Sequence, residues 1–201
     1  MHSIARIVPI TTFLGLSFGL SWLFVLPLWL GDGLASPIFL VVALAMMFTP
    51  AIAALAVVFF VEKHPDGRSR RHALGLGSVR PVARFVRYLA LALVVPPALI
   101  LAALLVGAAF GVYPADLVNF SGFQETVDAQ LEALGQAPLP VPIGLLVGAQ
   151  FVNVFIGSIV NVIPALGEEL GWRGWLLPQL LPLGIVPAIL ISGVLWGLWH
   201  A

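Results

Sequence analysis

In this chain of 201 residues, 61% are hydrophobic, only 9% are charged, and the formal net charge is zero. Soluble domains carry about 25% charged residues, so the composition excludes a soluble globular protein and indicates an integral membrane protein. The sequence has no cysteine, which excludes a disulfide framework, a thiolate nucleophile and a cysteine-based metal site. It also has no glycine-rich phosphate loop and no nucleic-acid-binding motif, so no nucleic-acid partner is expected.

Five apolar segments predict an all-α fold, a polytopic bundle of about five transmembrane helices. The first four are each long enough to cross about 30 Å of hydrocarbon, and the fifth only just reaches that length. The segments are 7–30, 37–61, 85–112, 143–166 and 183–200.

Two long loops of opposite charge predict the orientation of the chain in the membrane. Loop 62–87 contains seven Lys and Arg residues against Glu62 and Asp66, whereas loop 113–142 contains four acidic residues and no Lys or Arg. The positive-inside rule places loop 62–87 in the cytoplasm and loop 113–142 outside. Arg6 agrees with this orientation and places the N-terminus in the cytoplasm.

Residues 121–137 of the acidic loop predict an amphipathic helix. Phe123, Val127 and Leu131 recur at helical spacing, opposite Asp128 and Glu132. Amphipathic helices of this kind typically lie on a membrane surface, here the outer interface. A role as a lid or a substrate guide is the alternative interpretation.

Glu168, Glu169 and Arg173 stand in sequence that is otherwise apolar. Charged side chains are costly within a bilayer, so they are rare there unless they have a partner or a function. Glu169 and Arg173 are an (i, i+4) pair, whereas Glu168 points about 100° away from Glu169 and shares a helix face with Asn161. We therefore expect Glu168 to face the bundle interior without a cation beside it, as a candidate general base. The alternative is a purely structural ion cluster at a helix end.

The last apolar segment contributes His200, which lies on one helical stripe with Trp196 and Ser192. Gly193 and Gly197 form a small-xxx-small pair, which predicts close approach of two helices and so of His200 to Glu168. The alternative interpretation is that His200 only forms a hydrogen bond to a neighbouring helix and has no catalytic role. Among the tryptophans, the pattern favours membrane-interface anchoring for Trp172 and Trp175. Pro178 and Pro182 predict a tight turn before the last segment.

The spacing Glu168-Glu169-x-x-x-Arg173, followed by Trp196-x-x-x-His200, resembles the first two motifs of the CPBP family. This family includes the CAAX prenyl proteases and the bacterial bacteriocin-processing and abortive-infection proteins. The resemblance implies that Glu168 activates the attacking water and that His200 holds that water or stabilises the oxyanion. It implies that Glu169, Arg173 and Trp196 order the site or bind the substrate. Asn161, on the same helix face as Glu168, is a further candidate for this role. The resemblance also divides the chain into N-terminal transmembrane helices, 1–142, and the start of a catalytic domain, 143–201.

A metal-assisted mechanism and a metal-free one both remain open from the sequence. The family has often been regarded as metalloproteases, in which case Glu168 and His200 are the candidate ligands of a Zn²⁺ ion. The chain departs from the family pattern in two ways. Trp196 stands where the family usually has Phe, a change from which we expect little effect. The family also has a further helix with a second His and an Asn or Asp, and no such motif is present, so we expect the chain to be truncated at its C-terminus.

The resemblance thus implies an intramembrane endopeptidase that acts on a membrane-associated peptide or protein. Its expected location is a bacterial or archaeal plasma membrane, with the lipid bilayer as its surroundings. Cleavage of prenylated C-a-a-X tails is a weaker inference from the same resemblance. The alternatives are a non-catalytic immunity or scaffold protein and a proton-coupled carrier that uses Glu168 and His200 as a relay.

Overall fold

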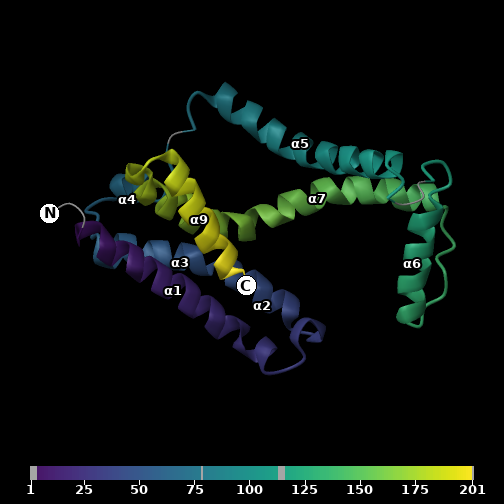
Figure 1. Ribbon diagram of the computed structural model, residues 1–201, viewed down its shortest axis with the longest axis horizontal. Helices are drawn as coiled ribbons and strands as arrows, with labels where there is room; N and C mark the ends of the chain where they lie inside the picture. Colours follow the sequence, from purple (N-terminus) through teal and green to yellow (C-terminus); the bar gives the residue numbers. More distant parts are fainter. Residues whose placement is uncertain (1–3, 78, 113–115, 201) are drawn as a thin grey trace. The chain divides into compact units, whose positions relative to one another are not determined.

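A computed structural model describes residues 4–77, 79–112 and 116–200, with side chains from Ile7 onward. The described residues form helices and no strand, which confirms the predicted all-α class. The chain forms two compact units, one from residues 1–78 and 161–201 and the other from residues 79–160. Figure 1 shows the helices of both.

Four helical stretches of the described residues are long and apolar enough to cross a membrane. The first is formed by α1 (Ile4–Trp29), and the second by α2 (Phe39–Met47), α3 (Thr49–Ala56) and the π-helix η2 (Val57–Val61). The third is formed by α5 (Val82–Ala109), and the fourth by α7 (Ile143–Glu169) and its continuation. That continuation is the π-helix η3 (Leu170–Leu176), α8 (Leu177–Leu180) and the 3₁₀-helix η4 (Leu181–Leu183).

The fifth predicted segment is the helix α9 (Ile185–Trp199), which has 15 residues. At 1.5 Å per residue it is only about 22 Å long, shorter than the hydrocarbon core. The predicted turn before it is present at η4, which contains Pro182 and is followed by Gly184 with a φ of 103°. A positive φ of this kind favours glycine, so Gly184 lets the chain reverse into α9.

The first unit has an aromatic core between α1 and η3. Phe13 of α1 packs its ring 5.4 Å from that of Trp172 and 4.9 Å from that of Trp175. Both tryptophans are fully buried, so the predicted interface anchoring of Trp172 and Trp175 is wrong. The physical reason is that both tryptophans lie on the π-helix η3, which packs against α3 inside the unit. The helix α1 runs beside α3 (Figure 1).

A buried polar contact joins α1 to α3 and α9. The hydroxyls of Ser21 and Thr49 lie 2.5 Å apart, and the indole N–H of Trp199 donates to Ser21 Oγ at 2.5 Å. Thr49 also donates within its own helical stretch, to the carbonyl of Met46 at 2.9 Å. Polar contacts between helices are stabilising in lipid because the groups find no water there. They fix α9, and with it the following His200, against α1.

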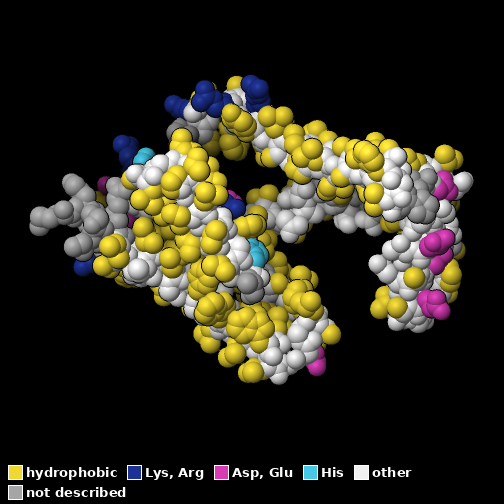
Figure 2. All heavy atoms as spheres, viewed as in Figure 1, with side chains coloured by type: hydrophobic (Ala, Val, Ile, Leu, Met, Phe, Trp, Pro, Cys, Tyr) yellow, Lys and Arg dark blue, Asp and Glu magenta, His cyan; other side chains and the backbone are white. Residues whose placement is uncertain are grey.

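The second unit contains α5, the first part of α7 and α6 (Ser121–Ala133), which carries the predicted amphipathic pattern. The arginines gather at the start of α5 and the acidic side chains along α6 (Figure 2). The helix predicted for 121–137 is confirmed, although α6 ends at Ala133. Residues 113–115 of the acidic loop lie outside the described residues. Hydrogen bonds from the backbone N–H groups of Asn119 and Val118 hold the pKa of Asp116 below its ordinary value, against a smaller opposing effect of burial.

Candidate active site

The predicted site lies where α7 continues into η3, and two glycines bring this stretch against the corner between α2 and α3. A Cβ at Gly167 would lie 2.7 Å from Phe48 Cδ1, and one at Gly171 would lie 2.6 Å from the backbone oxygen of Pro50. Only glycine fits such approaches. By contrast, a Cβ at Gly193 or Gly197 would have no described atom within 4 Å. The close helix approach predicted at that pair is therefore wrong, and it occurs at Gly167 and Gly171 instead.

Arg173 contacts both glutamates of the first motif. Its Nη1 lies 2.8 Å from Glu169 Oε1 and 3.6 Å from Glu168 Oε1. The Glu169–Arg173 pair is confirmed, but the expectation that Glu168 has no cation beside it is wrong. The reason is local geometry: Arg173 lies on a π-helix, whose i→i+5 spacing brings residues five apart onto one side of a turn.

The two carboxylates differ in their surroundings. Glu168 is buried, with 7% of its surface exposed, whereas the Glu169 side chain is 47% exposed. A buried carboxylate must be paired or hydrogen-bonded, because an isolated ion in a low dielectric is very costly. The predicted inward orientation of Glu168 is therefore confirmed, and the groups that satisfy it define the site.

Trp196 contacts each of the other residues of the two motifs except Glu169. Its indole N–H donates a hydrogen bond to Glu168 Oε1. The guanidinium carbon of Arg173 lies 4.9 Å from the centre of its ring, and the His200 ring lies 4.5 Å from it. A guanidinium over an indole face is a favourable cation–π contact. Glu168, Arg173 and His200 thus meet around one indole.

His200 has a defined tautomer when its ring is neutral. Its Nδ1 lies 3.0 Å from the backbone carbonyl of Trp196, which can only accept, so Nδ1 carries the proton. The lone pair is then on Nε2, which has no hydrogen-bond partner among the described residues. No direct bond joins Glu168 to His200 within this part of the chain; both contact Trp196.

Asn161, the remaining candidate, is not brought into this group. It lies seven residues before Glu168 on α7, but its side chain is exposed and makes no hydrogen bond to another described residue. Its predicted ordering role has no contact in the first unit to support it.

An apolar pocket of about 320 Å³ opens beside His200. It is enclosed by α1, the 3₁₀-helix η1 (Gly33–Ala35), α2 and the end of α9. Its lining includes Trp22, Leu34, Phe39, Met46, Trp199 and His200. The imidazole is the titratable group of this lining, so an apolar ligand in the pocket would lie next to it.

The described residues do not supply a zinc site. No group of three or more His, Cys, Asp or Glu side chains within them is close enough to hold a metal ion. Catalytic zinc uses three protein ligands, and Glu168 and His200 provide two. The guanidinium of Arg173 also lies beside Glu168 Oε1, where a second cation would be repelled.

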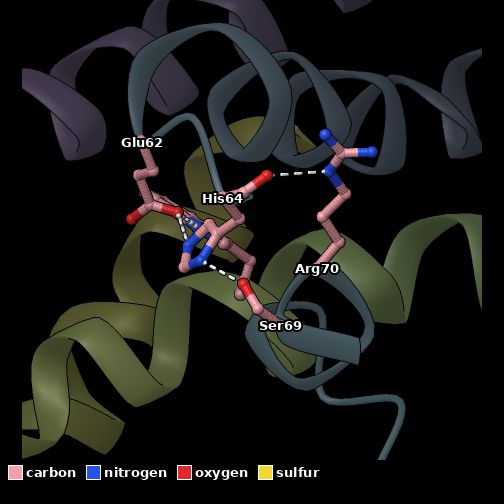
Figure 3. Close-up of polar contacts among 5 residues, drawn as sticks. Glu62, His64, Ser69 and Arg70 are labelled. Atoms are coloured by element: carbon pink, nitrogen blue, oxygen red, sulfur yellow. Dashed lines mark hydrogen bonds and ion pairs between the residues drawn. The ribbon is translucent and has the colours of Figure 1, made fainter. Parts of the chain in front are cut away.

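A second polar cluster, absent from the sequence prediction, lies at the end of η2 (Figure 3). His64 Nε2 lies 3.0 Å from Glu62 Oε2, and His64 Nδ1 lies 2.8 Å from Ser69 Oγ. Arg70 donates from Nε to the carbonyl of His64 at 3.0 Å. Ser69 and Arg70 belong to α4 (Gly67–Ala73), so the cluster holds this short helix against the end of η2. The polar run 62–70 could have indicated this cluster, but its charge pattern on its own predicts only the orientation of the chain in the membrane.

Comparison with known families identifies the C-terminal part of the chain. Residues 150–201 match the family model described as Rce1-like, type II CAAX prenyl endopeptidase. This segment is similar to the CAAX endopeptidases of the CPBP family. The match covers Glu168, Glu169, Arg173, Trp196 and His200 and agrees with the helical, membrane-spanning fold. Searches of curated proteins and of solved structures gave no match.

The CPBP assignment confirms the class predicted from the two motifs, that of an integral membrane protein related to CAAX endopeptidases. It concerns the family only. The roles of individual residues depend on the geometry around Trp196.

Proposed function

We propose that the protein is an intramembrane endopeptidase in which Glu168 activates water for attack on a peptide bond. The observation that carries this proposal is the meeting of Glu168, Arg173 and His200 around the Trp196 indole. All four residues lie in the segment that matches the CAAX endopeptidase family. A buried carboxylate and an imidazole that contact the same side chain are groups expected of general acid–base catalysis.

In the proposed reaction, a water molecule bound by Glu168 gives up a proton to the carboxylate. The oxygen attacks the carbonyl carbon of the scissile bond, and the carbonyl π electrons move to its oxygen. When the tetrahedral intermediate collapses, the C–N bond breaks and Glu168 returns the proton to the leaving amine. The products are a carboxylic acid and an amine, between which the second proton of the water passes to give a carboxylate and an ammonium group, and Glu168 is regenerated.

His200 has a role that depends on its protonation state. The neutral ring, with its proton on Nδ1, offers the Nε2 lone pair to a hydrogen of the water. The protonated ring instead donates from Nε2 and stabilises the oxyanion. Arg173 Nη1 lies 3.6 Å from Glu168 Oε1, and Glu169 holds Arg173 through the 2.8 Å ion pair.

The substrate is proposed to carry an apolar group near the scissile bond, as a prenylated C-a-a-X tail does. The apolar pocket beside His200 supports this choice, because its 320 Å³ volume is lined almost wholly by hydrophobic side chains. Binding of an apolar chain there would bring the following peptide towards the imidazole. The proposed orientation keeps loop 62–87 and the N-terminus in the cytoplasm of a bacterial or archaeal cell.

The test uses the full-length protein in liposomes and a quenched fluorescent peptide that ends in a farnesylated C-a-a-X tail. Glu168→Gln preserves the size of the side chain and removes the base, so turnover should fall about 10²–10⁴-fold. Glu132→Gln, the same change at an exposed position of α6, is the matched control and should leave turnover unchanged. The same peptide with an unmodified cysteine reports whether the apolar group is needed.

Cleavage by the wild-type protein that is lost in Glu168→Gln supports the proposal. Absence of cleavage by the wild type, or wild-type turnover in Glu168→Gln, contradicts it. Equal cleavage of the two peptides would contradict only the proposed substrate class.

A further inference from the structure

We infer that Trp196 is a positioning residue whose indole N–H fixes the Glu168 carboxylate and reserves Oε2 for the attacking water. This inference rests on the proposed function and adds to it the atom that takes the proton. It also assigns a polar role to a position where the family motif usually has phenylalanine.

The two oxygens of Glu168 are not equivalent. Oε1 accepts the indole N–H of Trp196 and faces Arg173 Nη1 at 3.6 Å. Oε2 has no hydrogen bond or ion pair to another described residue. A carboxylate has lone pairs on both oxygens, and donors on one of them limit rotation about the terminal bond. Oε2 is therefore the oxygen left to bind water.

The indole is itself held on several sides. Its ring contacts the guanidinium of Arg173, at 4.9 Å from Cζ, and the ring of His200, at 4.5 Å. The backbone carbonyl of Trp196 accepts a hydrogen bond from His200 Nδ1. The same residue thus orients the carboxylate through its side chain and the imidazole through its main chain. A base held within a narrow range of orientations needs less reorganisation in the transition state.

Phenylalanine at this position would keep the ring and lose the donor. It could still lie over Arg173 and against His200, because both contacts need only an aromatic face. It could not bond Glu168 Oε1, since it has no N–H. The expectation from sequence that Trp196 and Phe are equivalent therefore does not hold for the contact with Glu168.

The experiment compares Trp196→Phe with a matched control in the assay described above. Loss of a hydrogen bond to a charged group should lower kcat about 10–100-fold, with KM unchanged, because the indole contacts the base and not the substrate. The control is Trp175→Phe, which removes another indole-to-glutamate bond, that of Trp175 to Glu62 Oε2 at 3.3 Å. It should alter stability and leave kcat at the wild-type value.

A second variant removes only the N–H group. Replacement of Trp196 by 3-benzothienylalanine keeps the shape of the indole and substitutes sulfur for nitrogen, so folding and the contact with Arg173 are preserved. The kcat of this variant should match that of Trp196→Phe. In ¹⁵N-labelled protein, the indole N–H signal that is lost in Trp196→Phe should also shift in Glu168→Gln, which a tryptophan that does not donate to Glu168 would not show.

The outcomes separate this inference from the proposed function. If the wild type cleaves the peptide and Glu168→Gln does not, the function holds. Wild-type kcat in the benzothienyl variant would then overturn the role of Trp196 alone. An equal fall in kcat in Trp175→Phe would also overturn it, because the effect would then follow from general destabilisation.

Discussion

The indole N–H of Trp175 donates to Glu62 Oε2 at 3.3 Å, across 113 positions of the chain. This oxygen also bonds His64, so one carboxylate joins η3, which carries Arg173, to the basic loop. Trp175 is fully buried. The packing of the first motif and the position of α4 are therefore connected through a single side chain.

Removal of this connection should release α4. In Glu62→Ala, His64 and Trp175 both lose their acceptor, so we expect trypsin to cleave after Arg68, Arg70 or Arg71 about tenfold faster, as local opening becomes easier. Limited proteolysis in liposomes measures this rate. His72→Ala, at an exposed position of the same helix, is the control. Equal cleavage rates in Glu62→Ala and the wild type would show that Glu62 does not hold the helix.

Gly171→Ala should destabilise the protein by about 1–3 kcal/mol, the usual cost of an overpacked core. The added methyl group would meet the backbone of Pro50 at 2.6 Å, and backbone atoms cannot move aside as a flexible side chain can. Thermal unfolding in detergent gives the change in stability. At Gly193 there is open space, so Gly193→Ala should be neutral or stabilising by about 0.5–1 kcal/mol. The reverse order of the two variants would contradict the close approach at Gly171.

Arg173 should matter more for stability than Glu169. Arg173→Ala leaves the buried Glu168 without its cation, a loss of about 3–5 kcal/mol for a fully buried pair and less here because Arg173 is 41% exposed. Glu169→Gln should cost under about 1 kcal/mol, because Glu169 is half-exposed and Arg173 keeps Glu168 as a partner. Chemical unfolding of both single variants and of the double variant measures the coupling. A larger loss in Glu169→Gln would refute this ranking.

The charge asymmetry predicts which face of the membrane each loop occupies. The chain has no native cysteine, so a single cysteine can be placed at Gly67 or at Ser121 and labelled with an impermeant maleimide in intact cells. Ser121→Cys should be labelled from outside, and Gly67→Cys only after the membrane is opened. The opposite pattern would place the first motif towards the outer face.

Local features of the sequence predicted the helical fold and the Glu169–Arg173 pair. An (i, i+4) relation needs only a helix, and apolar segments of sufficient length need only a membrane. Burial of Glu168 also followed from its helix face. These predictions depend on residues close together in the chain, which a periodic pattern reports directly.

The remaining features depend on packing between distant segments. Trp172 and Trp175 resembled interface anchors because their partner Phe13 lies more than 150 positions away on α1. The close helix approach at Gly171 depends on the position of Pro50. The hydrogen bond from Trp196 to Glu168 depends on how α9 folds back after Gly184. A single sequence gives the chemistry of each side chain but not which of them become neighbours.

The π-helix η3 has a consequence for the spacing of the first motif. A π-turn holds one residue more than an α-turn, so it acts as a one-residue insertion that the helix absorbs locally. Deletion of one residue between Leu170 and Arg173 would restore a regular α-helix while the turns on either side keep their register, and it would bring Glu168 to four residues before the arginine and Glu169 to three. The (i, i+4) partner of the arginine would then be Glu168 in place of Glu169. The number of residues in this turn is thus as much a part of the motif as their identities.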